Sequence, residues 1–125
     1  MFRKKKIILA ENHPATLDVL NNLGTNYDCQ KNYIKAEALY KECLEKRKNI
    51  IGDLHMETFD CKYNLANNYT SQKKFVESEK LFKECIANSK LIGNNRNIFS
   101  SIQSLAISYR MQGKYNEAKI LLEDL

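Results

Sequence analysis

Hydrophobic residues recur along the chain at helical spacing, in blocks that short polar segments separate. In TLDVLNNLGTNY (16–27), apolar side chains three or four positions apart form one face of a helix. A second block, IKAEALYKECLEKRKNII (34–51), has the same spacing. The polar segment CQKNY (29–33) between them has the length of a turn between antiparallel helices. The pattern therefore predicts a helical hairpin.

The hairpin pattern occurs three times. Leu23 aligns with Leu65 at an offset of 42 residues, and Leu65 aligns with Leu105 at an offset of 40. Repeats of this length are typical of solenoids. Seven further sets recur at the same offsets: Gly24/Ala66/Ala106, Tyr27/Tyr69/Tyr109, Gln30/Gln72/Gln112, Tyr33/Phe75/Tyr115, Ala36/Ser78/Ala118, Leu39/Leu81/Leu121 and Tyr40/Phe82/Leu122.

The recurring residues include both small side chains and large aromatic ones. We expect the small ones where the two helices of a hairpin approach closely, and the aromatic rings around that crossing. A single hairpin cannot bury both of its faces, so neighbouring hairpins must stack. Gly113 marks the turn of the third hairpin, where a left-handed backbone would cost glycine little. Lys31 and Lys73 hold the same place in the other hairpins, so the turn must tolerate other residues there.

The segments NLGTNYDCQKNYIKAEALY, NLANNYTSQKKFVESEKLF and SLAISYRMQGKYNEAKILL resemble the tetratricopeptide repeat. The period near 42, with HPATL and HMETF before the first helices, resembles the kinesin light chain-type subfamily. The resemblance implies an all-α fold, a right-handed superhelical solenoid of antiparallel helix pairs. Two departures stand out: His55 is followed by Met56 instead of Pro, and NRNIF in the third unit has no His.

These units divide the chain into repeat 1 (13–54), repeat 2 (55–94) and an incomplete repeat 3 (95–125), within one solenoid domain. MFRKKKIILA (1–10) aligns with CLEKRKNIIG (43–52), so residues 1–12 are expected to be the end of a preceding repeat helix. We expect a fragment of a longer array or a reduced reading frame, with apolar faces at both ends. Self-association through those ends is expected.

Composition narrows the class of protein. Among 125 residues there are one Pro and four Gly, too few for a many-stranded β protein. The four cysteines lack zinc-ligand spacing and are read as reduced thiols that pack as small apolar residues, which favours the cytoplasm. A secretory signal and an apolar run of about 20 residues are missing from the sequence, so no membrane association is predicted.

The sequence offers little for catalysis. It contains no glycine-rich phosphate loop, nucleophile elbow or HExxH motif, and we expect no enzyme activity, no cofactor and no metal. His13 and His55 occupy equivalent positions in different repeats, and a structural role at the start of a helix is expected for both. Thr16 and Thr58 are predicted to cap those helices.

The family resemblance implies a binding surface instead. First helices of tetratricopeptide repeats line a concave groove that holds an extended peptide. Asparagine side chains both donate and accept, so they can bind a peptide main chain, and Asn22 with Asn64 is the principal expected pair. The predicted groove residues are Asn21, Asn22, Thr25, Tyr63, Asn64, Asn67, Ser71, Gln103, Ser104 and Arg110, with Asp18, Asp28, Asp60, Thr70, Ser108 and Met111 beside them.

The groove lacks the basic set with which chaperone-binding members of the family hold a carboxylate, so chaperone tails are not expected. The predicted partner is another protein or peptide, and cargo adaptors follow only by analogy with kinesin light chains. One alternative is a structural spacer or assembly fragment of a longer array. Another, RNA or an anionic membrane on a basic face, is disfavoured because glutamates interleave the lysines and the aromatics fall on core positions. The net charge is +5.

Overall fold

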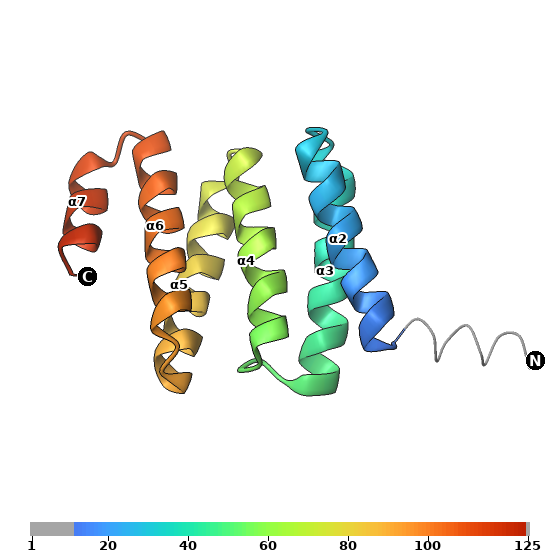
Figure 1. Ribbon diagram of the computed structural model, residues 1–125. Helices are drawn as coiled ribbons and strands as arrows, with labels where there is room; N and C mark the ends of the chain where they lie inside the picture. Colours follow the sequence, from blue (N-terminus) through green and yellow to red (C-terminus); the bar gives the residue numbers. More distant parts are fainter. Residues whose placement is uncertain (1–11, 125) are drawn as a thin grey trace, which may run out of the picture.

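The computed structural model describes residues 12–124, which form helices that pair and stack in chain order (Figure 1). Each helix packs against the next one in sequence, and α2 also contacts α4, as α4 contacts α6. The prediction of an all-α solenoid is confirmed. The expectation that residues 1–12 are the end of a preceding repeat helix concerns positions 1–11, which lie outside the described residues. The helices are α2 (Pro14–Cys29), α3 (Tyr33–Ile51), α4 (Met56–Ser71), α5 (Phe75–Ile92), α6 (Asn95–Met111) and α7 (Tyr115–Glu123).

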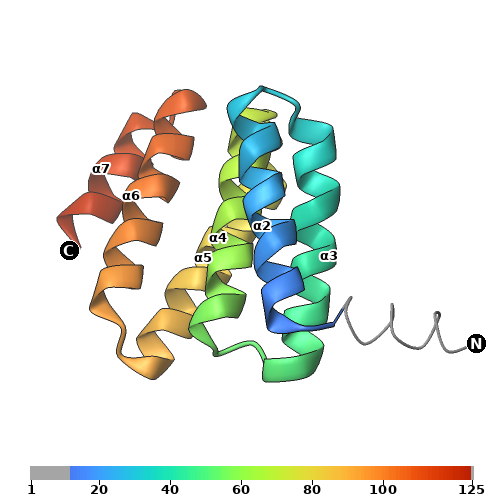
Figure 2. The same ribbon diagram turned by 45° about the vertical axis from the view of Figure 1, so that its right-hand side comes forward.

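The helices lie in two layers. The first helices of the three pairs, α2, α4 and α6, form one layer, and we call it the first-helix layer (Figure 1). The second helices, α3, α5 and α7, form the other, as the turned view makes clear (Figure 2). We call the pairs α2–α3, α4–α5 and α6–α7 pairs one, two and three.

Histidines begin the first helices of pairs one and two. The Nδ1 atom of His13 accepts a hydrogen bond from the backbone N–H of Ala15, and Nδ1 of His55 accepts one from Glu57, both at 3.1 Å. Each imidazole thereby satisfies a backbone donor that the helix itself leaves free. The expected structural role of the two histidines is confirmed.

The expected threonine caps were wrong. Thr58 is fully buried, and its hydroxyl donates to the carbonyl oxygen of Gly52 at 2.7 Å. Thr16 lies inside α2 and not at its cap. In α6, which lacks the histidine, the side chain of Asn94 caps the helix by accepting from the N–H of Asn97 at 3.1 Å.

The turns within the pairs share one backbone geometry. Lys31 and Lys73 both adopt a left-handed φ of 63°, and Gly113 has a φ of 78°. In pair one, the N–H of Asn32 closes the turn by donating to the carbonyl oxygen of Tyr27 at 2.8 Å. The turn expected from the sequence is therefore present, and two lysines hold a conformation that usually favours glycine.

Buried residues join consecutive pairs. Ala36 and Tyr40 of α3 cluster with Leu65 and Tyr69 of α4, which links pairs one and two. A second cluster links pairs two and three, in which Phe82 and Leu105 repeat the positions of Tyr40 and Leu65 and Ala66 joins them. The core is thus a row of equivalent contacts between neighbours, as expected for a stack of repeats.

A polar contact also repeats between pairs, and we call it the Glu–Gln–Lys lock. In the first lock, the carboxylate of Glu37 accepts from Gln72 Nε2 at 2.8 Å and from Lys74 Nζ at 3.2 Å. The second lock consists of Glu79, Gln112 (2.8 Å) and Lys114 (3.4 Å). Each lock fixes the register of one pair on the next.

The first lock should make stability depend on pH. Burial alone would raise the pKa of Glu37, but hydrogen bonds from Lys41, Gln72 and Lys74 outweigh it and lower the pKa from 4.5 to about 2. A carboxylate with a lowered pKa stabilises the fold above its ordinary pKa, and this contribution is lost as pH falls from 4.5 towards 2. We expect Glu37→Gln to lower the free energy of unfolding by about 1 kcal/mol at pH 7.

Urea unfolding of both proteins at several pH values between 7 and 2.5 tests this expectation. The difference between wild type and Glu37→Gln should shrink steadily below pH 4.5. Glu45→Gln, an exposed site on the same helix, is the matched control and should change little. A difference that stays constant across this range would contradict the assignment.

Candidate functional site

The predicted site residues all lie in the first-helix layer (Figure 1). Every repeat contributes to the set. The layer is continuous because α2 contacts α4 and α4 contacts α6. Its predicted members are Asn21, Asn22 and Thr25 on α2, Tyr63, Asn64, Asn67 and Ser71 on α4, and Gln103, Ser104 and Arg110 on α6.

Four of these residues hold the layer together. Asn64 Nδ2 donates to Asn21 Oδ1 at 3.1 Å, between α4 and α2. The hydroxyls of Tyr63 and Ser104 lie 2.8 Å apart and share a hydrogen bond between α4 and α6. Both bonds join one repeat position to the next position along in the following repeat. This pairing was not predicted from the sequence, because the repeats align at equivalent positions and these bonds are shifted by one residue.

The remaining predicted residues differ in their exposure to solvent and in their hydrogen bonds within the fold. Asn22, Gln103 and Arg110 are exposed, and so is Ser71. Thr25 is also exposed, but its hydroxyl donates to the carbonyl oxygen of Asn21 at 3.1 Å and accepts from the hydroxyl of Tyr40 at 3.2 Å. Asn67, on α4, is half-buried. The exposed amide and guanidinium groups are the donors and acceptors that this surface offers to a ligand.

The acidic residues beside the site are engaged in the fold. Asp18 pairs with the buried guanidinium of Arg47. Asp28 accepts from the Tyr40 hydroxyl at 3.0 Å and from Asn68 Nδ2 at 2.7 Å. Two of the three expected surface acids therefore have partners from the second helices or from the next repeat.

The other flanking positions separate into buried and open ones. Thr70 and Ser108 are buried, and the Thr70 hydroxyl lies 2.5 Å from that of Ser78. The expectation that these two residues face a ligand was therefore wrong. Met111 is half exposed. Burial raises the pKa of Asp60, the remaining acidic residue beside the layer.

Buried thiols form a second polar cluster. Cys43 Sγ and Cys61 Sγ lie 3.0 Å apart between α3 and α4, and Arg47 Nη1 donates to Cys61 at 3.4 Å. The hydrogen bond with Cys43, together with burial, raises the pKa of Cys61, and burial raises that of Cys85 to about 12. All four cysteines, including the exposed Cys29, are free thiols.

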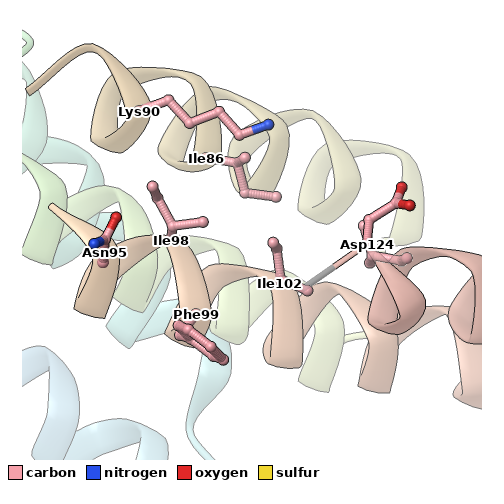
Figure 3. Close-up of a pocket in the computed structure, with 8 residues that line it drawn as sticks. Ile86, Lys90, Asn95, Ile98, Phe99, Ile102 and Asp124 are labelled. Atoms are coloured by element: carbon pink, nitrogen blue, oxygen red, sulfur yellow. The ribbon is translucent and has the colours of Figure 1, made fainter. Parts of the chain in front are cut away.

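A cavity of about 290 Å³ lies apart from the predicted site. It opens between α5, α6 and the end of α7, where Ile86, Ile98 and Phe99 form an apolar wall (Figure 3). Lys90 and Asp124 stand at its border. This cavity was not predicted from the sequence, although apolar surface was expected at the ends of the stack.

Within residues 12–124, no helix combines the length and the hydropathy that a membrane span needs. Over the same residues, no three or more His, Cys, Asp or Glu side chains gather in a way that could hold a metal ion.

Comparisons with known proteins agree with the architecture. Residues 57–125 and residues 16–55 match two family models, both described as tetratricopeptide repeat. No curated protein sequence matches the chain.

Solved structures share the fold. The chain is similar to kinesin light chain nearly identical TPR-like repeats from Podosopora anserina, at 21% identity, with a TM-score of 0.77 over 90% of this chain and 55% of that one. A substituted form of the same protein gives a TM-score of 0.80 at 21% identity, over 91% of this chain and again 55% of that one. The chain thus spans about half the length of these structures. The expected likeness to kinesin light chain-type repeats is confirmed for the fold, and the chain belongs to the tetratricopeptide repeat family.

Proposed function

We propose that this chain is a non-catalytic interaction scaffold that binds an extended peptide across its first-helix layer. One observation carries the proposal. Exposed hydrogen-bonding side chains lie on the first and last helices of the layer, Asn22 on α2 and Gln103 and Arg110 on α6. The bonds of Asn64 and Tyr63 to neighbouring helices support it, because they hold these groups on a fixed frame.

The chemistry of the exposed groups favours main-chain recognition. An amide side chain can pair with a peptide N–H and C=O together, whatever the side chains of the peptide. Arg110 adds a donor that pairs well with a carboxylate. The ligand that fits these groups best is an extended segment with an acidic residue near the α6 end.

The proposal can be tested by selecting peptides from a displayed random library against the full chain. A double variant, Asn22→Ala/Gln103→Ala, should bind the selected peptide about tenfold more weakly, since it loses two hydrogen-bonding side chains. Glu45→Ala/Asn49→Ala, two exposed positions on α3, is the matched control. Asn64 is left intact in this design, because its loss would disturb the layer as well as the binding surface.

Binding measured by fluorescence anisotropy separates the outcomes. Loss in the first double variant with retention in the control would support the proposal. No enriched peptide, or equal binding by both variants, would count against it. Circular dichroism of each variant shows whether the helices remain folded.

The basic residues do not favour nucleic acid as the partner. Lys41, Lys46, Lys74 and Lys114 each lie within 3.4 Å of a glutamate carboxylate. Paired lysines leave less unopposed positive charge for phosphates. Four free thiols also suit a reducing compartment, which supports a cytoplasmic location as part of this proposal.

A further inference from the structure

The two ends of the stack expose positions that are buried inside it. On α2, Leu23 is 40% exposed, while its equivalents Leu65 and Leu105 are 3% and 2% exposed. Val19 is 61% exposed, while the same position on α4, Cys61, is fully buried. Inside the stack these positions face the preceding pair, so α2 presents an apolar surface for which pair one provides no cover.

The opposite end has the complementary surface. Leu122 on α7 is 36% exposed, while its equivalents Tyr40 and Phe82 are 1% and 0% exposed. Phe99 on α6 is 50% exposed, while its equivalent Phe59 is 8% exposed. In the interior of the stack, Tyr40 and Phe82 are covered by the first helix of the following pair.

The internal contacts show how the two ends fit each other. Tyr40 clusters with Leu65, and Phe82 clusters with Leu105. Continuing the same series would place Leu122 against Leu23 of another molecule. We infer that a second copy of this chain docks head to tail, with its α2 surface around Leu23 on the α7 surface around Leu122.

Polar residues at the ends support this occupant. In pair three, Lys119 stands at the position of the lock glutamates Glu37 and Glu79. In pair one, Asn32 stands at the position of the lock lysines, Lys74 and Lys114. A docked copy would place Lys119 beside Gln30 and Asn32, whose amide oxygens accept from an ammonium group. A lysine in place of Asn32 would repel Lys119, so the two substitutions fit each other across the joint.

A head-to-tail joint leaves one free surface of each kind on the complex. It is heterologous, so it adds further copies instead of closing as a symmetric dimer. The average mass in solution should therefore rise with concentration without stopping at two chains.

Sedimentation velocity of the full chain over a wide concentration range tests the inference. Leu23→Asp blocks one surface and Leu122→Asp the other, so each variant alone should stay monomeric, with association weakened at least ~30-fold. Mixing the two variants should give a 1:1 complex that grows no further, since one intact surface of each kind remains. Val76→Asp, at a position 78% exposed on α5, is the control and should assemble as the wild type does.

Three results would overturn the inference: a wild type that is monomeric at every concentration, variants that still associate on their own, or a mixture that forms no complex. Circular dichroism of each variant tests whether its helices remain folded. If either aspartate variant unfolds, Leu23→Ser and Leu122→Ser replace the pair, and the same mixing experiment decides.

Discussion

Replacing Phe82 by alanine is expected to lower the free energy of unfolding by about 3–5 kcal/mol. The ring is fully buried, clusters with Ala66 and Leu105, and meets Tyr63 edge-on with ring centres 6.1 Å apart. Its removal leaves a cavity in the contact between pairs two and three, and helices on both sides cannot collapse to fill it. Urea unfolding followed by circular dichroism measures the loss.

Val76→Ala is the matched control for that measurement. Val76 lies on the same helix as Phe82 but is 78% exposed, so its truncation should change stability by less than about 0.5 kcal/mol. Because each pair contacts only its neighbours, Phe82→Ala should also broaden the transition by uncoupling pair three from the rest. Equal effects from the two variants would contradict the assignment of Phe82 to the core.

Gly24→Ala should be destabilising by about 1–3 kcal/mol, although alanine favours helices more than glycine does. A Cβ atom at this position would lie 2.7 Å from Cε1 of Tyr40. That ring cannot easily move, because it is buried and its hydroxyl bonds to Thr25 and Asp28. Thermal or urea unfolding of the single variant gives the cost.

A double-mutant cycle identifies the cause. Pair three combines Ala106 with Leu122 at the two equivalent positions, so a smaller side chain opposite the alanine is compatible with the fold. Tyr40→Leu lowers stability by itself, but Gly24→Ala should cost less in that background, with a coupling of about 1 kcal/mol or more. Additive effects would show that Tyr40 is not what makes glycine necessary here.

The architecture could be predicted because the repeat fixes it three times over. Leu23, Leu65 and Leu105 set the register, and Gly113 marked the turn position that Lys31 and Lys73 occupy in the other repeats. Such features depend on local spacing and on the packing of equivalent positions, and both can be read from a sequence. They required no knowledge of the distance between repeats.

The candidate site was less predictable, because its contacts join unlike positions. The Asn64–Asn21 bond connects residues 43 positions apart, one more than the repeat offset. Lys62 is buried at 2% exposure and pairs with Asp53 at 2.7 Å, at a position where the other repeats carry apolar residues. Neither a shifted pair nor a buried cation follows from helical periodicity, since both depend on how two repeats are placed against each other.

The repeated lock makes the second pair an interchangeable unit. The turn between α4 and α5 carries Gln72 and Lys74 towards pair one, and α5 carries Glu79 towards pair three, so both joints have the same chemistry. A duplicated copy of this unit would meet each neighbour through an interface that already exists. Gene duplication could therefore lengthen the array by whole units without new compensating mutations, whereas pair three, with Lys119 at the acceptor position, could not be copied in the same way.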